Sequence, residues 1–284
     1  FVADIGDCRV LHPDFSNRLM SLSDLIGGLS VADAVPQIET ASGDEASAIV
    51  VRHLRELTAD DVMALKRWSD DNGIAVYLQP KGPDTVHRLW PEEHELSYRL
   101  DDFGLKLAFH PQHFIQVNAA INRALVARAL ELLDPGPDDR VLDLFCGLGN
   151  FTLPLATRAG HVTGIEGAAD LIEAAGTNAR RNGLDNVELD VADLTADVSS
   201  RPWYRAGFDG VLIDPPRSGA FEVLPMIAGS GAKRVVYVSC NPGTLARDAG
   251  ELTRQHGFRL IGAGIADMFP HTAHVESIAL FERA

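Results

Sequence analysis

Val141-Leu-Asp-Leu-Phe-Cys-Gly-Leu-Gly-Asn-Phe151 is the stretch of sequence that decides the fold. It begins as a mostly apolar run, which predicts a buried strand, and Gly147 and Gly149 then predict a tight turn into a helix. Glycines in such a turn let the backbone approach a ligand closely. The pattern favours a loop that binds a nucleotide-like ligand, although one glycine turn is weak evidence by itself.

Strand-like and helix-like segments alternate around this stretch. A helix from Asn118 ends at the breaker Asp134-Pro-Gly-Pro, and strands then alternate with helices until two closing strands that have no helix between them. Such alternation predicts a parallel sheet with helices on both faces and an antiparallel hairpin at one edge. We therefore expect an α/β protein with a Rossmann-like seven-stranded sheet. The expected strands are 140–145, 162–165, 187–189, 210–213, 234–238, 258–265 and 275–282, and the expected helices are 151–159, 168–182, 219–229 and 243–255.

The first part of the chain has a different pattern. Short strand-like runs mix with a helix that starts after the N-cap residue Thr58 and runs to about Asp71, which predicts a smaller α+β domain. We expect this domain over residues 1–110 and the α/β domain over residues 111–284. Phe1 opens a stretch that reads like the inside of a strand, so we also expect that the start of the protein is missing. The strand candidates in this part are 48–53, 74–78, 85–89 and 105–109.

Composition limits the classes of function. The formal net charge is −15, and neither the first hundred residues nor the remainder has an excess of basic residues, which argues against a simple phosphate-binding surface. No apolar run reaches the ~18–20 residues that a membrane helix needs. Three widely spaced cysteines do not make a disulfide framework, so the cytoplasm is the expected compartment. Contacts with a nucleic acid would need local basic clusters or a part of the protein outside this chain.

Acidic residues stand at the ends of three predicted strands. Glu166 lies about 20 residues after the glycine turn, where an acid accepts hydrogen bonds from ribose hydroxyls. Asp193 follows the third strand, where it could accept from an adenine amino group, and Asp214 ends the fourth. No Gly-Lys-Ser/Thr motif is present to bind phosphates. An adenosine ligand without phosphates, S-adenosylmethionine, fits this pattern better, although Glu166 as an ordinary solvated loop acid stays an alternative.

Asp214-Pro-Pro-Arg217 has two interpretations. Proline fixes the backbone, so the motif can be no more than a rigid turn. A similar motif occurs on the substrate side of amino-methylating enzymes, but those need an aromatic residue after the prolines to stack a base. Arg217 takes that position here, which disfavours amino methylation.

Cys240 stands directly after the predicted strand 234–238, and ligands of open α/β sheets bind outside the carboxyl ends of the strands. A cysteine there can be a packing residue. As a thiolate it can instead add to carbon 6 of a pyrimidine and make carbon 5 nucleophilic toward a methyl group. A base must then remove the proton from carbon 5 so that the thiol leaves. Glu276, at the start of the last strand, can supply that base.

Neighbouring charged residues bear on this chemistry. Arg217 or Arg247 could favour the thiolate. His271 and His274 precede Glu276 in a His-x-x-His-x-Glu run, which allows a metal site as an alternative. The run lacks the i, i+4 spacing of helical ligands and has no further Cys or His support, which disfavours that alternative.

Five motifs, in order along residues 105–284, resemble the RNA uracil-5-methyltransferase family. Together they are highly specific. The segments 181–187 and 202–209 are more similar to the branch that acts on bacterial 23S ribosomal RNA than to the transfer-RNA branch. The motifs are Phe114–Asn118, Asp143–Phe151, Asp214–Arg217, Val238–Asp248 and Asp267–Glu276.

The resemblance implies a class I methyltransferase sheet and the transfer of a methyl group from S-adenosylmethionine to carbon 5 of a uridine in 23S ribosomal RNA. It makes Cys240 the nucleophile and Glu276 the base that removes the proton. The family flips its target base out of folded RNA, which costs energy and favours loops. The residues that would line the cofactor are Gln116, Phe145, Asn150, Glu166, Asp193 and Asp214.

Cys8 resembles the last of four thiolate ligands of a [4Fe–4S] cluster in this family. The other three ligands and a small RNA-binding β-barrel domain would precede Phe1. We therefore expect Cys8 to be a metal ligand in the intact protein and the cluster to be absent from this chain. Cys146 is expected to pack within the glycine loop.

Other functions stay open as alternatives. The nearest is the same chemistry on a transfer-RNA uridine. An RNA cytosine-5-methyltransferase typically has a second cysteine beside its Asp-Pro motif, which Asp214-Pro-Pro-Arg217 lacks, and a non-catalytic RNA-binding module would not need Cys240 and Glu276. We expect a monomer whose partner is its 23S ribosomal RNA substrate, with no membrane attachment.

Overall fold

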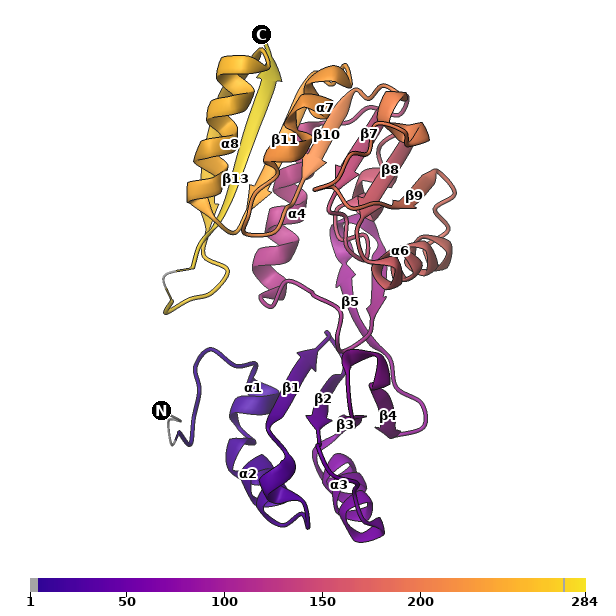
Figure 1. Cartoon of the computed structure of the whole chain (residues 1–284), viewed down its shortest axis with the longest axis vertical. Coiled ribbons are helices and arrows are strands. Elements are labelled where there is room, and N and C mark those ends of the chain that lie inside the picture. The colour runs from indigo at the N-terminus through magenta and orange to yellow at the C-terminus, as the bar shows by residue number, and fades with distance from the viewer. Residues whose placement is uncertain (1–4, 273) are drawn as a thin grey trace. The chain divides into compact units, whose positions relative to one another are not determined.

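The computed structural model describes residues 5–272 and 274–284, and Figure 1 gives the labels of the elements. The expected strand at Phe1 lies outside the described residues. The chain divides into two compact units. The smaller unit comprises residues up to Tyr98 together with Ala108–His113, and the larger comprises Arg99–Leu107 and Phe114–Ala284. The chain crosses between the units more than once, so a single boundary between residues 110 and 111 stays a prediction.

A seven-stranded sheet is the centre of the larger unit. Its strands are β7 (Arg140–Leu144), β8 (His161–Glu166), β9 (Val187–Val191), β10 (Gly210–Ile213), β11 (Arg234–Ser239), β12 (Phe258–Ala266) and β13 (Glu276–Arg283). The order across the sheet is β12-β13-β11-β10-β7-β8-β9. The five strands from β11 to β9 are parallel, and β13 is antiparallel to both β11 and β12. The prediction of a Rossmann-like α/β sheet that ends in an antiparallel pair is confirmed.

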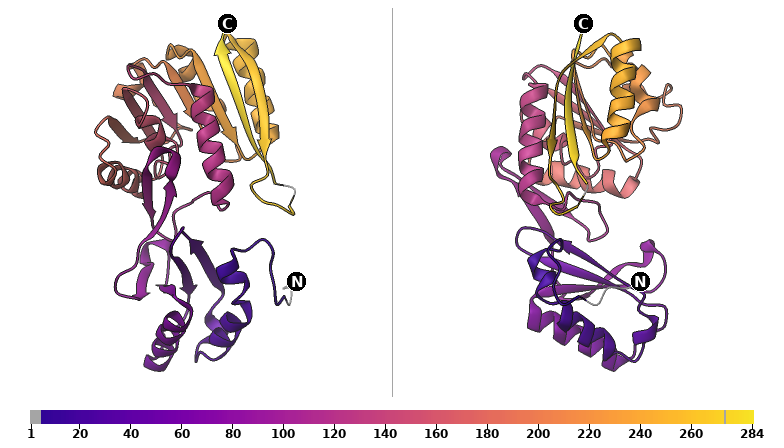
Figure 2. Two further views of the ribbon diagram at one scale, coloured as in Figure 1. Left: turned by 180° about the vertical axis from the view of Figure 1, so that it is seen from behind. Right: turned by 90° about the vertical axis from the view of Figure 1, so that its left-hand side faces the viewer.

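Helices cover both faces of this sheet. Its helices are α4 (Ala119–Leu133), α5 (Thr152–Ala156), α6 (Ala169–Arg181), α7 (Leu224–Gly229) and α8 (Pro242–Gln255), with 3-10 turns at Pro202–Arg205 and Phe221–Val223. Figure 2 shows the sheet nearly edge-on, with α4 and α8 on opposite sides. The α-helix expected over 219–229 begins only at Leu224. Gly219 has a left-handed φ of 85°, and Pro225, which has no N–H to donate, fits only in the first turn of a helix.

The central strands of this sheet are buried on both faces, whereas the edge strand β12 is mostly exposed. Leu142, Val211 and Val235, on three neighbouring strands, have no exposed surface. Burial of each such side chain stabilises the fold by about 1.5–3 kcal/mol, and it also explains why these strands read as continuous apolar runs in the sequence. Polar side chains can therefore gather only where the strands end.

The smaller unit is built on a four-stranded sheet. Its elements are α1 (Pro13–Ser16), α2 (Leu19–Gly27), β1 (Gln37–Ser42), β2 (Ser47–Arg52), α3 (Ala59–Asn72), β3 (Ile74–Gln79) and β4 (His87–Trp90), with 3-10 turns at Ala32–Ala34 and Pro83–Thr85. The order is β1-β2-β3-β4, and β2 and β3 are the parallel pair. Helix α3 connects that pair and begins with a capping box of Thr58 and Asp61. The sequence pattern does not predict β1, because most of its residues are polar and Ala41 is its one buried residue.

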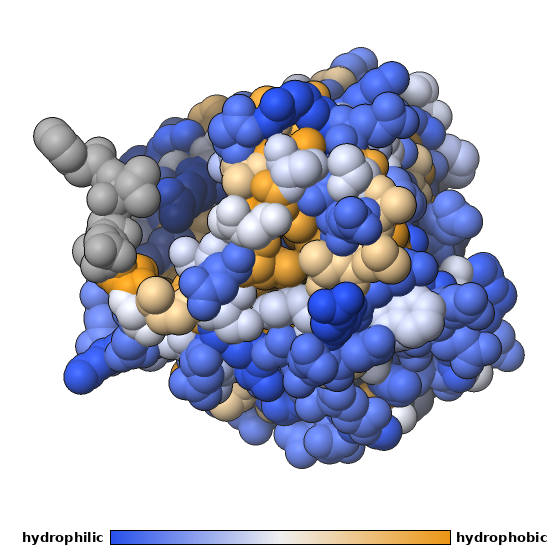
Figure 3. All heavy atoms as spheres, turned by 90° about the horizontal axis from the view of Figure 1, so that it is seen from below, coloured by the Kyte–Doolittle hydropathy of each residue, from blue (hydrophilic) through white to orange (hydrophobic). Residues whose placement is uncertain are grey.

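A two-stranded hairpin belongs to neither of the two larger sheets. Strands β5 (Leu96–Leu100) and β6 (Leu105–Phe109) form a two-stranded sheet around a 3-10 turn at Asp101–Phe103. On the face shown in Figure 3, apolar side chains reach the surface in a patch ringed by polar residues. No helix among the described residues is both long and apolar enough to span a bilayer.

Candidate active site

The carboxyl ends of the parallel strands meet at one edge of the sheet, and β13 starts there because it runs in the opposite direction. Ser239, the last residue of β11, pairs with Ser277 of β13. The adjoining residues at that edge are Cys240 after β11 and Glu276 at the start of β13. Asp214 follows β10, the other neighbour of β11. The fold thus gathers three residues that are far apart in the sequence at one edge of the sheet.

The Cys240 thiol is half-buried. Its pKa is raised above the ordinary value, first by burial and then by the negative charges of Glu276 and Asp214. Arg217 acts in the opposite direction, but it does not outweigh burial and the two acids. The guanidinium of Arg247 is turned to Asp248 instead, with its Nε 2.7 Å from a carboxylate oxygen. Of the two arginines considered from the sequence, Arg217 is the one that acts on the thiol.

Glu276 is almost completely buried, with 3% of its surface exposed. Its Oε1 lies 3.4 Å from His274 Nε2, whereas its Oε2 has no hydrogen-bond partner among the described residues. Burial raises the pKa of this carboxyl, and the hydrogen bond from His274 and the charge of Arg217 lower it. Burial, and then the charge of Glu276, raise the pKa of Asp214 to about 7.

These three groups are all acidic, and each is harder to ionise than it would be in water. Burial disfavours the charged form of Cys240, Asp214 and Glu276 alike, and their charges oppose one another. A positively charged ligand would relieve that repulsion. The unpartnered Oε2 of Glu276 is in addition an acceptor that can take a hydrogen bond or a proton. The site is therefore suited to a cation and to proton removal.

The glycine loop after β7 has a left-handed backbone at three positions. Phe145, Gly147 and Gly149 have φ angles of 64°, 54° and 98°. A Cβ at Gly149 would overlap Leu153 Cδ1, whereas nothing lies within 4 Å of a Cβ at Gly147. A left-handed phenylalanine is uncommon, and such residues cluster at functional sites. The backbone of this loop is held in a conformation that a ligand-binding turn requires and that ordinary residues avoid.

Glu166 ties two loops together at this edge. Its Oε2 accepts a hydrogen bond from the N–H of Gly147 at 3.2 Å, and its Oε1 accepts from the N–H groups of Gly167 and Ala168 at 2.7 and 3.1 Å. These bonds give both carboxylate oxygens a partner without a ligand, and they also hold the carboxylate at the end of β8. Its contact with ribose hydroxyls stays a prediction.

Three other expected cofactor residues have different surroundings. Asp193 is exposed and accepts hydrogen bonds from Thr195 N–H and Oγ1 through Oδ1 alone, which lowers its pKa. The side chain of Asn150 exchanges two hydrogen bonds of 2.9 Å with Asn122 of α4. Gln116 is half-buried in the irregular segment before α4. Their role toward a cofactor stays a prediction.

The structure adds residues that the sequence reasoning does not select. Asp143 of β7 is fully buried, its Oδ2 accepts from Thr152 Oγ1 at 2.6 Å, and its Oδ1 has no partner in the described part of the chain. Burial raises its pKa to about 8. His274 lies between Arg217 and Glu276, with its Nδ1 3.2 Å from Arg217 Nη2. An acidic residue inside an apolar strand is the sequence signal that could have selected Asp143. The spacing of two residues from Glu276 is the signal that could have selected His274.

The metal predictions find little support in the described residues. They contain no cluster of three His, Cys, Asp or Glu side chains that could hold a metal ion, and His271 is exposed. Cys8 is half-buried, and its N–H donates to Ser16 Oγ at 3.0 Å. Cys146 and Cys240 belong to the other unit. A cluster with four thiolate ligands does not fit the described residues.

Known proteins resemble this chain over its whole length. It is 57% identical over 284 residues to the 23S rRNA (uracil(1939)-C(5))-methyltransferase RlmD of Alkalilimnicola ehrlichii, and 53% identical over 283 residues to the RlmD of Xanthomonas campestris. All of this chain is covered in both comparisons, but it spans only 64% of the length of each relative. The crystal structure of Pyrococcus abyssi tRNA (uracil-54, C5)-methyltransferase with S-adenosyl-L-homocysteine is similar with a TM-score of 0.79 and 26% identity, over 99% of this chain and 70% of that one.

A model of the tRNA (uracil-5-)-methyltransferase family matches residues 51–284. The match includes the glycine loop, Cys240 and Glu276, and it extends into the smaller unit. The resemblance expected from the motifs is confirmed. The chain belongs to the tRNA (uracil-5-)-methyltransferase family.

Proposed function

We propose that the protein transfers a methyl group from S-adenosylmethionine to carbon 5 of a uridine in 23S ribosomal RNA. The substrate is taken from the relatives, which are named for uracil 1939 of that RNA. The observation that carries the proposal is the pairing of β11 with β13, because it brings a half-buried thiol and a buried carboxyl side by side. A thiol nucleophile and a base are the two groups that this reaction needs.

The residues present fit the cofactor. S-adenosylmethionine supplies a methyl group made electrophilic by a positive sulfonium. Asp214 and Glu276, whose charges burial disfavours, suit a positive ligand, and the left-handed glycine loop lets the backbone come close to one. Following the resemblance, the residues that hold the cofactor are Gln116, Phe145, Asn150, Glu166, Asp193 and Asp214.

Cys240 and Glu276 divide the chemistry between them. The Cys240 thiolate adds to carbon 6 of the uracil, and the electrons of the C5=C6 double bond make carbon 5 nucleophilic. S-adenosylmethionine would supply the methyl group to carbon 5, and the electron pair of the broken S–CH3 bond would stay on its sulfur. Glu276 then takes the proton from carbon 5. The electrons of that C–H bond restore the double bond, and the C6–S bond breaks to return the thiolate. Adjacent strands suit this division, because carbons 5 and 6 are adjacent in the ring.

Two parts of the prediction, RNA binding and the cluster, would need groups beyond those of this chain. The net charge of −15 means that RNA contacts need local basic groups or further segments, and the relatives are longer than this chain. Cys8 as a [4Fe–4S] ligand would need thiolates from outside the described residues, so no step of the reaction depends on it. A ribosomal RNA substrate would put the reaction in the cytoplasm.

Product identity tests the proposal. The protein is incubated with radiolabelled S-adenosylmethionine and a transcript of the 23S region around uracil 1939, and the nucleosides are separated. We expect 5-methyluridine at one uridine. Labelling of a transfer-RNA transcript in place of the ribosomal one would move the substrate to transfer RNA, and 5-methylcytidine as the product would overturn the proposal.

A further inference from the structure

His274 connects two charged residues at the active edge, the edge of the sheet where Cys240, Asp214 and Glu276 lie. Its Nδ1 lies 3.2 Å from Arg217 Nη2, and its Nε2 lies 3.4 Å from Glu276 Oε1. A guanidinium can only donate, so Nδ1 must be the acceptor and the imidazole must carry its proton on Nε2. That proton points to Glu276. The three side chains therefore form a chain with one direction, from Arg217 through His274 to Glu276.

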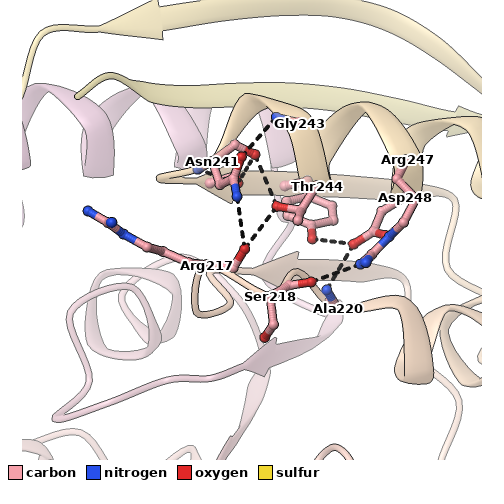
Figure 4. A network of polar contacts seen from close by, with 10 residues as sticks. Arg217, Ser218, Ala220, Asn241, Gly243, Thr244, Arg247 and Asp248 are labelled. Carbon is pink, nitrogen blue, oxygen red and sulfur yellow. Dashed lines mark hydrogen bonds and ion pairs between the residues drawn. The ribbon is translucent and has the colours of Figure 1, made fainter. Parts of the chain in front are cut away.

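The backbone of Arg217 is anchored beside Cys240. Its carbonyl oxygen accepts hydrogen bonds from Asn241 Nδ2 at 3.1 Å and from Thr244 Oγ1 at 3.3 Å. Figure 4 shows this carbonyl facing Asn241 and Thr244 while the Arg217 side chain extends away from them. Asn241 directly follows Cys240, so the residue that fixes the imidazole is itself fixed to the loop of the thiol.

The imidazole is also held by its own surroundings. The ring packs edge-on against Phe269, with 4.5 Å between ring centroids and an interplanar angle of 87°. The backbone N–H of His274 donates to Thr272 Oγ1 at 3.1 Å. The distance of 3.4 Å to Glu276 is long for a hydrogen bond, as is common at catalytic sites before substrate binds. The ring is thus restrained from several sides while its Nε2 faces the carboxylate.

A hydrogen bond from His274 would leave the carboxylate with one defined free atom. Oε1 of Glu276 faces the imidazole, and Oε2 has no partner among the described residues. Oε2 is then the oxygen that can receive a proton. Burial opposes the ionisation of this carboxyl and Arg217 favours it, while the charge of Glu276 opposes the ionisation of Asp214 and Cys240. Without His274, a buried carboxyl in such company would be harder to ionise and freer to rotate.

We propose that His274 is a positioning residue, kept in the Nε2–H tautomer by Arg217, which holds Glu276 so that Oε2 receives the proton from carbon 5. The inference rests on the proposed function, since it assumes that Glu276 is the base. In the elimination step the proton moves to Oε2, the C–H electrons form the C5=C6 bond, and the sulfur of Cys240 leaves with the electrons of the C6–S bond.

Release of tritium from carbon 5 of a labelled uridine in the RNA measures this step. His274→Phe removes the donor to Glu276 and should slow tritium release about 10- to 100-fold, the range of one hydrogen bond to a charged group. The covalent protein–RNA adduct should then accumulate. The rise of the tritium-release rate with pH, which reports the ionisation of Glu276, should move to higher pH. The reason is that the variant loses the hydrogen bond from His274 that lowers the pKa of Glu276. His274→Gln, which retains a donor near the position of Nε2, should recover much of the rate.

His161→Phe is the matched control. His161 Nε2 lies 3.3 Å from Glu188 Oε2, so it is a similar His–Glu pair, but it stands at the opposite end of β8 from the active edge. That variant should keep the tritium-release rate and the pH profile of the original protein. Equal slowing in His161→Phe and His274→Phe would reduce the effect to general destabilisation and overturn the proposal.

Two further results separate this proposal from the proposed function. If Glu276→Gln fails to accumulate the adduct, the role of Glu276 as the base is wrong. If Glu276→Gln accumulates it while His274→Phe releases tritium at the original rate and pH, only the role of His274 is wrong. The tautomer has its own readout that does not depend on turnover. In protein labelled with ¹⁵N-histidine, His274 should carry its proton on Nε2 at pH 8, and a proton on Nδ1 would overturn the proposal.

Discussion

At the scale of single residues, Cys240 presents an electrostatic conflict. The proposed reaction needs a thiolate, yet burial and the charges of Glu276 and Asp214 raise the pKa of the thiol in the absence of ligands. Arg217 offsets only part of that effect. Because the opposing charges belong to acids at the edge where we propose that the positive cofactor binds, we expect the thiol to ionise more readily once that ligand is bound.

Gly149 tests the glycine loop at the same scale. Its φ of 98° is strained for any residue with a Cβ, and that Cβ would overlap Leu153. We expect Gly149→Ala to cost about 1–3 kcal/mol and to weaken cofactor binding at least tenfold, because the loop must shift. Calorimetric titration with S-adenosylmethionine measures the affinity. Gly147→Ala is the matched control.

Gly147 differs from Gly149 in a way that predicts a smaller effect. Its φ of 54° lies in the left-handed region that alanine reaches at a cost of about 1 kcal/mol, and nothing lies within 4 Å of an added Cβ. Equal losses in the two variants would contradict the account of the loop. The sequence predicts a tight turn at both glycines. It cannot predict the left-handed conformation of Phe145 between them and the strand, because the surrounding loop imposes that conformation on an unfavourable residue.

At the scale of elements, a buried carboxylate joins α8 to the turn after β10. Asp248 of α8 has no exposed surface and accepts hydrogen bonds from Ala220 N–H at 2.8 Å, Tyr237 Oη at 2.7 Å and Arg247 Nε at 2.7 Å. Figure 4 shows the bond from Ala220 to Asp248 and the bond from Arg247 to the Ser218 carbonyl oxygen, both at the turn. The turn carries Arg217, so this network supports the residues that surround Cys240.

Tyr237→Phe tests this network. The change removes one donor to a buried carboxylate and leaves the ring in place, so we expect the free energy of unfolding to fall by about 1–3 kcal/mol. Urea denaturation followed by circular dichroism measures it. Tyr204→Phe is the control, since no hydrogen bond of the Tyr204 hydroxyl is found among the described residues, and its effect should stay within about 0.5 kcal/mol. A Tyr237→Phe variant as stable as Tyr204→Phe would show that the network contributes nothing.

Elements that have an apolar run or a capping residue are the ones that the sequence predicts. Strands β7, β10 and β11 follow from their apolar runs, and α3 follows from Thr58. The candidate active-site residues Asp214, Cys240 and Glu276 follow from their positions at strand ends. The sequence does not predict strand β1, because its mostly polar residues carry no periodic hydrophobic signal. Nor does it predict the contacts from Arg217 through His274 to Glu276, because these depend on the antiparallel register of β13, which is a tertiary property.

At the scale of the whole molecule, buried acids make stability depend on pH. Burial raises the pKa of Asp143 from 3.8 to about 8 and that of Asp214 from 3.8 to about 7. Between the unfolded and folded pKa values the folded protein binds more protons than the unfolded chain, so these groups make the free energy of unfolding fall as the pH rises. His94, whose pKa burial lowers, has the opposite effect up to about its ordinary value of 6.5. The dependence of the free energy of unfolding on pH is therefore a sum of opposing contributions.

Asp143→Asn isolates one of these contributions. Asparagine keeps an oxygen that can accept from Thr152 but cannot ionise, so His94, which belongs to the other unit, contributes equally to both proteins. Relative to the original protein, we expect the variant to gain stability steadily as the pH rises from about 4 to 8. Denaturation at a series of pH values without cofactor measures the difference. A difference that does not change with pH would contradict the raised pKa of Asp143.

The covalent adduct with RNA tests the central claim most directly. Glu276→Gln cannot accept the carbon-5 proton, so the methylated uracil should stay bonded to Cys240, and a slower band containing both protein and RNA should appear on a denaturing gel. Cys240→Ala should form no adduct and no 5-methyluridine while it still binds S-adenosylmethionine. A Glu276→Gln variant that turns over normally without an adduct, or a Cys240→Ala variant that methylates RNA, would contradict the account.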